Sequence, residues 1–141
     1  MSQAHQIAGF LNWAVVVALV GIGVDFLRSK QVKPHHAQIL AVPLESLPIG
    51  AQKLILMFMK GTGLVAIVTA VSMSILLREP FARQEAWSRT ALLVVAGVAL
   101  IPTLLVTFQV RATTGAKAPW WPHVVMLAAL GIAFYLTRDF H

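Results

Sequence analysis

Four long apolar runs separated by shorter polar stretches dominate the chain. They cover residues 7–27, 54–77, 91–108 and 120–136, with lengths of 21, 24, 18 and 17 residues. As α-helices they would measure roughly 26 to 36 Å, close to the ~30 Å hydrocarbon core of a bilayer. None alternates in the manner of a barrel strand, and only helices or closed barrels span membranes. The pattern predicts an all-α integral membrane protein, a four-transmembrane-helix antiparallel bundle with a single domain over residues 1–141.

The second run has an alternative interpretation, because it contains Lys60. The stretch from Gly61 to Leu77 is uncharged and would alone measure about 26 Å, nearly enough to cross. Lys60 would then mark the interface, and residues 54–59 would lie along the membrane surface.

The first loop, residues 28–53, is too apolar for a solvated tether. It begins with basic residues and continues through an apolar stretch, residues 39–49, interrupted by prolines. We therefore expect this long loop to fold back against the membrane or to cap the bundle. The second loop, residues 78–90, is predicted to be a polar turn or a surface helix. Trp87 and the pair Trp120–Trp121 are typical of interfacial aromatic anchors.

Composition agrees with a membrane protein. The apolar residues make up 58% of the chain and the charged residues only 11%, whereas soluble domains carry about 25% charged residues. The absence of cysteine excludes disulfides, thiolate nucleophiles and Cys-ligated metals. The net charge of +6 lies mainly between the apolar runs, so membrane lipids with anionic headgroups are the expected partner, and nucleic acid is not.

The distribution of basic residues predicts an orientation. The first and third loops share one side of the membrane, and six Lys or Arg lie there: Arg28, Lys30, Lys33, Lys53, Arg111 and Lys117. The opposite side carries four: Arg78, Arg83, Arg89 and Arg138. The positive-inside rule then places loops 28–53 and 109–119 in the cytoplasm and both termini outside.

Small residues recur at helical spacing and predict close packing. In the first run Ala14, Ala18 and Gly21 lie on one face that continues to Asp25, so we expect Asp25 to point into the bundle. Asn12 would then lie on the opposite face, against another helix or a second copy. The segment Gly61–Thr62–Gly63 lacks the rest of a nucleotide-binding pattern and is interpreted as a site of close helix packing. Further stripes are Thr62, Ala66, Ala70 and Ser74; Ala99, Thr103 and Thr107; and Ala129, Ala133 and Thr137.

Antiparallel connectivity gathers polar residues at one membrane surface. Asp25, Lys60, Arg111 and His123 would all lie there, joined by the loop residues His35 and His36 and by Gln109. One interpretation is structural: Asp25 neutralises Lys60 or Arg28, or Lys60 extends to the headgroups. The other is a one-sided polar pocket for an anionic headgroup, a quinone or another amphiphile. A proton or ion pathway has less support, because the other half of the bundle lacks titratable groups to continue it.

Several chemistries find no basis in the sequence. There is no H-E-x-x-H, G-x-S-x-G or P-loop motif, and five acidic residues cannot build a carboxylate-rich di-metal centre. Adjacent histidines such as His35 and His36 cannot readily share one metal, and no second His within a run could pair with His123 around a haem. No catalytic residue, metal or cofactor is therefore predicted, and the chain is expected not to be an enzyme.

Two functions remain open on these grounds, with a membrane enzyme acting on a lipid or quinone as a third. The first is an accessory or interaction subunit of a bacterial cytoplasmic membrane, forming a homo-oligomer or joining a larger complex. The alternative is a membrane-embedded binding protein or transporter for an anionic or amphiphilic small molecule. Four short helices in 141 residues resemble the architecture of many small bacterial membrane proteins, DoxX-like proteins among them, but no motif assigns the chain to one family.

Overall fold

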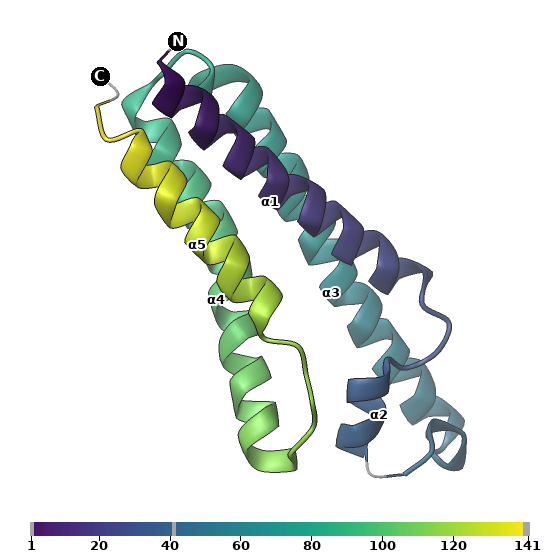
Figure 1. Ribbon diagram of the computed structural model, residues 1–141. Coiled ribbons are helices and arrows are strands. Elements are labelled where there is room, and N and C mark those ends of the chain that lie inside the picture. Colours follow the sequence, from purple (N-terminus) through teal and green to yellow (C-terminus); the bar gives the residue numbers. More distant parts are fainter. Residues whose placement is uncertain (1, 41, 140–141) are drawn as a thin grey trace.

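The computed structural model describes residues 2–40 and 42–139, and every element in these ranges is helical. The elements are α1 (Gln3–Arg28), α2 (Pro34–Leu40), η1 (Leu44–Ser46), α3 (Ile49–Leu76), η2 (Leu77–Phe81), α4 (Ala86–Thr114) and α5 (Trp121–Leu136). Figure 1 shows α1 beside α3 and α4 beside α5, with both ends of the chain at the same end of the molecule. The two pairs also pack together, α1 against α5 and α3 against α4.

Local sequence sets the helix ends. The Ser2 hydroxyl accepts the backbone N–H of His5 at 3.3 Å and caps α1. Gly115 ends α4 with a φ of 71°, a left-handed conformation that favours glycine, and its N–H donates to the carbonyl of Arg111. Pro122 lies in the first turn of α5, where a missing N–H does no harm. Pro102 lies inside α4, and the helix runs on through it to Thr114.

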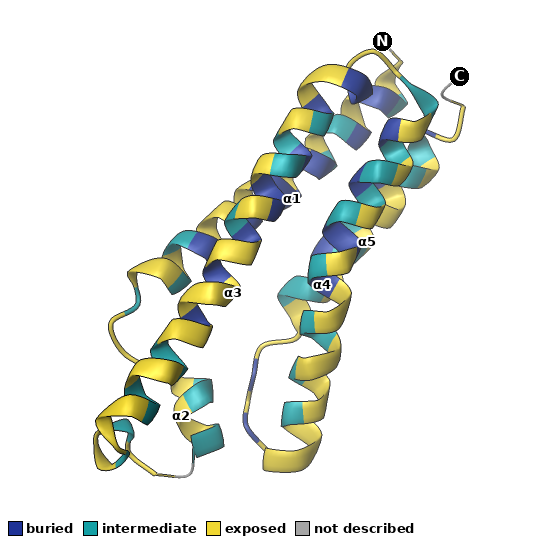
Figure 2. Cartoon of the chain, turned by 180° about the vertical axis from the view of Figure 1, so that it is seen from behind, coloured by how far each residue is buried: buried dark blue, intermediate teal, exposed yellow. Residues whose placement is uncertain are grey.

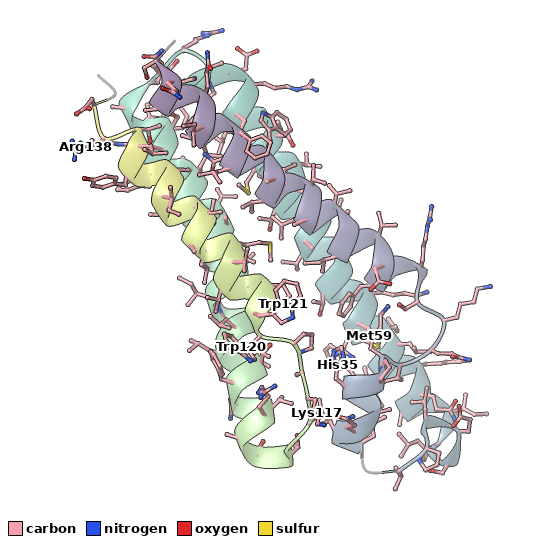
Figure 3. All side chains as sticks on the ribbon, in the orientation of Figure 1. His35, Met59, Lys117, Trp120, Trp121 and Arg138 are labelled. Carbon is pink, nitrogen blue, oxygen red and sulfur yellow. The ribbon has the colours of Figure 1, made fainter. Side chains whose placement is uncertain are left out.

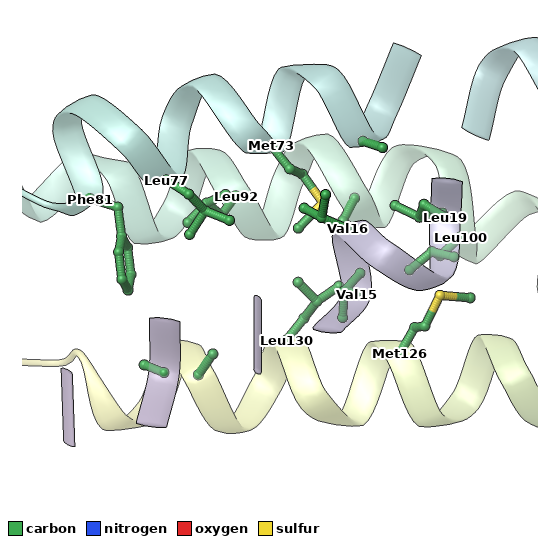
Figure 4. Packing of buried hydrophobic residues seen from close by; sticks show 14 of the residues in the cluster. Val15, Val16, Leu19, Met73, Leu77, Phe81, Leu92, Leu100, Met126 and Leu130 are labelled. Atoms are coloured by element: carbon green, nitrogen blue, oxygen red, sulfur yellow. The ribbon is translucent and has the colours of Figure 1, made fainter. Parts of the chain in front are cut away.

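The core lies where the four long helices meet, towards the end that holds both chain ends. Figure 4 shows Val15, Met73 and Leu130 meeting there from α1, α3 and α5, and Leu92 joins them from α4. Each of these side chains is no more than 2% exposed. In Figure 2 the buried positions follow the facing sides of the helices, whereas the outer sides are exposed. Those outer sides are apolar: Phe10 is 73% exposed and Val98 71%. Such a surface suits lipid rather than water.

The helices α1 and α3 approach each other closely at two glycines. A Cβ placed on Gly63 would lie 2.9 Å from the carbonyl oxygen of Gly23, and a Cβ on Gly23 would lie 2.9 Å from the carbonyl oxygen of Gly63. The two backbones therefore touch, as small residues allow in membrane helices. The prediction of close packing is confirmed at Gly63, whereas a Cβ on Gly61 would meet nothing within 4 Å.

Three helical segments are long and apolar enough to cross a membrane: Gln3–Arg28, Ile49–Phe81, in which α3 continues into η2, and Ala86–Thr114. The first three predicted runs lie within these segments, which extend beyond them at both ends. The apolar helix α5 has only 16 residues, about 24 Å.

One part of the alternative interpretation of the second run is wrong, whereas the position of Lys60 at the interface stays a prediction. Residues 54–59 belong to the same unbroken helix as residues 61–76, so they do not form a separate surface segment.

The buried face of α1 differs from the prediction. Ala14 and Gly21 are exposed, and the Asp25 side chain is 60% exposed, so it does not point into the core. The buried positions are instead His5, Ala8, Asn12, Val15, Val16, Leu19 and Gly23. Asn12 faces the core and donates its side-chain amide to the carbonyl of Ala8 at 2.9 Å, which satisfies it within its own helix. The prediction took the stripe of small residues as the buried face, but the bulky side chains of Val15 and Leu19 supply more apolar area to bury.

The first two connections fold as short helical elements. In the first, α2 packs beside α4, and the capping of the bundle by the whole loop 28–53 stays a prediction. In the second, η2 turns the chain and buries Pro80 and Phe81, while Arg83 and Glu79 form an exposed ion pair at 2.7 Å. The predicted polar turn is therefore also partly a hydrophobic anchor.

Candidate functional site

A cavity of about 620 Å³ lies between the two helix pairs, at the end away from the chain ends. Its walls come from the C-terminal part of α1, the first half of α3, the second half of α4 and the start of α5, and α2 closes part of its end. Most lining side chains are apolar, among them Phe26, Phe58, Val106 and Met126. Binding pockets for small molecules typically span about 300–1,000 Å³ and combine apolar walls with a few polar groups.

Its one ion pair within the described residues joins Asp25 of α1 to Lys33, just before α2. The Lys33 ammonium lies 2.6 Å from a carboxylate oxygen of Asp25. The Lys33 side chain is 23% exposed, and its ammonium also lies 5.9 Å from the centre of the Phe26 ring. The pair ties α2 to the end of α1 and leaves this pair of charges neutral overall.

Three histidines line the cavity. His35 and His36 of α2 meet edge to face, with ring centres 4.2 Å apart, and His36 also stands edge-on to Phe26. Burial lowers the pKa of both, and nearby Lys33 lowers each pKa further. His123 reaches the cavity from the first turn of α5. Within the part of the chain that is described, the Nδ1 atoms of His36 and His123 are buried without a hydrogen-bond partner.

Three threonines add hydroxyls to the cavity wall. Thr62, Thr103 and Thr107 line it, and each donates its hydroxyl proton to the carbonyl four residues earlier, at 3.1, 2.7 and 2.8 Å. Their donors are therefore satisfied inside their own helices, and only oxygen lone pairs remain for an occupant. This also explains how hydroxyls can sit in an apolar wall.

A hydrogen bond joins α2 to the extended segment after α4 near the far end of the cavity. The backbone N–H of Lys117, in the extended segment after α4, donates to the side-chain oxygen of Gln38 in α2 at 2.9 Å. Arg111 donates to the carbonyl of Ala118 in the same segment at 3.2 Å. Figure 3 shows Lys117 on this segment and His35 on α2 across the open end. This hydrogen bond links the two helix pairs through α2 and the extended segment.

The structure brings four of the predicted site residues together. Asp25, His35, His36 and His123 line one cavity, although Asp25 lies at its exposed rim.

The other three predicted residues, Lys60, Arg111 and Gln109, do not line the cavity. The predicted Asp25–Lys60 pair is wrong: Lys60 is exposed on the outer side of α3, and Asp25 binds Lys33 instead. Sequence reasoning does not assign Lys33 to the site, because it interprets the basic residues of the first loop only as membrane charge. It also does not assign Thr103, although Thr103 lies on the same small-residue stripe as Ala99 and Thr107.

The described residues contain no group of three or more His, Cys, Asp or Glu that could hold a metal ion.

Comparisons with models of protein families, with curated proteins and with solved structures found no significant match to this chain. The site is therefore interpreted from its own chemistry.

Proposed function

We propose that this chain is a multi-pass protein of a bacterial cytoplasmic membrane that binds an amphiphilic small molecule between its helix pairs. The observation that carries the proposal is the cavity of about 620 Å³, with apolar walls and polar groups gathered at one end. An apolar tail would contact Phe58 and Val106, and a polar head would meet the histidines and Lys33. The same combination of apolar walls and few polar groups characterises small-molecule pockets in general.

The proposal includes a fourth crossing by α5. This helix is only about 24 Å long, but the extended segment of residues 115–120 continues it towards the end of α4. Ala116 and Ala118 of that segment are buried against protein, and non-helical backbone is tolerated at membrane depth where protein covers it. Loops 28–53 and 109–119 would face the cytoplasm, as the balance of basic residues favours.

The accessory-subunit function remains a second candidate for the same chain. Its support is the extensive exposed apolar surface, but lipid explains that surface equally well. The cavity has no role in an accessory subunit, and for that reason the binding function is preferred.

The test is to fill the cavity. Ala99 lines it, and its neighbour Val98 is 71% exposed on the outer side of the same helix. We expect native mass spectrometry of the protein extracted from membranes to show a co-purified small molecule of lipid-like mass. Ala99→Phe should remove that species, because the new ring occupies the cavity, and the matched control Val98→Phe should retain it. If no such species appears with the unaltered chain, or if Ala99→Phe retains it, the binding function is wrong.

A further inference from the structure

The cavity holds no unbalanced charge among the residues that line it. Its charged groups are Asp25 and Lys33, which neutralise each other at 2.6 Å. His35 and His36 favour the neutral form, because burial lowers the pKa of each. The other cations of this end, Lys60 and Arg111 among them, do not line it, and Arg111 already binds a backbone carbonyl. A charged head group would therefore find no unpaired opposite charge among the residues that line the cavity.

The hydrogen-bonding groups left for an occupant include imidazole donors. A buried N–H without an acceptor is rarer than a buried acceptor without a donor. The unpartnered, buried Nδ1 atoms of His36 and His123 are therefore assigned as bare lone pairs, which places the ring proton on Nε2. Because Nδ1 is buried in both residues and both line the cavity, Nε2–H is the group that can meet an occupant.

Resting on the proposed binding function, we propose that the occupant is an uncharged amphiphile whose head carries carbonyl oxygens, the chemistry of a quinone, with His36 and His123 as the donors. Carbonyl oxygens accept hydrogen bonds and carry no charge, so they match neutral imidazole N–H groups. An aromatic or quinonoid ring is also flat and apolar on its faces, and Phe26 and Phe58 line the same cavity.

The experiment compares three probes that share an apolar chain and differ in the head. Decyl-ubiquinone carries carbonyl acceptors, decylbenzene carries none, and laurate is anionic. Isothermal titration of the full chain in nanodiscs should give the tightest binding to decyl-ubiquinone. His123→Phe keeps an aromatic ring and removes one donor, so it should weaken decyl-ubiquinone binding about two- to tenfold and leave decylbenzene binding unchanged. His36→Phe should do the same, and the control Tyr135→Phe, on the exposed face of α5, should change neither.

Each other outcome identifies what has failed. If laurate binds most tightly and Lys33→Met abolishes that binding, the cavity takes anions and the inference is overturned while the binding function stands. If the three probes bind equally and Ala99→Phe weakens all of them, the donor assignment is wrong and the binding function again stands. If Ala99→Phe weakens the binding of none of the three probes, both the inference and the binding function are wrong. His36 lies in α2 outside the core of the bundle, so its variant tests the inference even if His123→Phe does not fold.

Discussion

The contact between Gly23 and Gly63 makes the sharpest prediction about stability. Changing Gly63 to Ala adds one methyl group 2.9 Å from the Gly23 carbonyl oxygen, 2.9 Å from the Phe26 Cβ and 3.1 Å from the Leu27 backbone nitrogen. Two of these atoms belong to the backbone of α1, which cannot rotate away. The helices must therefore separate by several tenths of an ångström along their closest contact.

A neighbouring glycine isolates the effect of this clash. Gly61 lies in the same helix, and a Cβ there meets nothing within 4 Å. Both Gly→Ala changes gain the same intrinsic helix propensity, about 1 kcal/mol in water, so their difference reports the steric term alone. Overpacking of a tight contact costs about 1–3 kcal/mol. We expect Gly63→Ala to be less stable than Gly61→Ala by that amount.

The measurement is reversible unfolding in mixed micelles, with increasing SDS and helicity as the signal. The two variants should give parallel transitions with that of Gly63→Ala at a lower SDS fraction. Gly63→Leu should lower the transition further, because it adds more atoms at the same place. Equal stability of Gly63→Ala and Gly61→Ala would refute the close approach of α1 and α3.

Two further predictions concern α2. His35 and His36 have a lowered pKa in the folded protein, so the unfolded segment binds protons first, and the docking of α2 should be fully stable above about pH 6.5 and weaken as the pH falls below it. The protection factors of the α2 amides, which correct the exchange rates for the intrinsic pH dependence of amide exchange, should fall as the pH is lowered from 8 to 5, about the range in which imidazole titrates. His36→Gln should reduce this pH dependence, and protection factors that do not change with pH would contradict the prediction. Asp25→Asn should loosen α2 but change global stability by less than about 1 kcal/mol, because the ion pair with Lys33 is partly exposed. The control variant Lys60→Met also removes an exposed charge and should leave the hydrogen exchange of α2 unchanged. Equal loosening of α2 by Asp25→Asn and Lys60→Met would argue against a role of the Asp25–Lys33 ion pair in holding α2.

The sequence predicted the positions of the helices well and the buried face of α1 poorly. Long apolar runs determine where helices form, so each run matches one long helix of the structure to within one residue or lies inside it. Which face of α1 packs depends on the partner, and the pattern offered two faces, one of small residues and one through Asn12 and Val15. Both have helical spacing, and only the positions of α3 and α5 decide which face is buried.

The candidate site was partly predictable for a topological reason. Alternating helix directions place the end of α1 and the start of α5 at one surface, and this brought Asp25 and His123 to one cavity. The partner of Asp25 was not predictable from helix ends, because it depends on how the chain turns before α2. That turn brings Lys33 back to Asp25, eight residues earlier in the chain.

The cavity and the glycine contact share one residue, and this links binding to stability. Phe26 lies against the Gly63 position, lines the cavity and meets His36 edge to face. Any change that separates α1 from α3 at the glycines therefore also moves a cavity wall and a neighbour of a proposed donor. Conversely, an occupant held against Phe26 would bind only the packed arrangement and stabilise it in proportion to its concentration. Gly63→Ala should thus lose both stability and affinity, whereas Ala99→Phe fills the cavity on the opposite wall and should lose affinity alone.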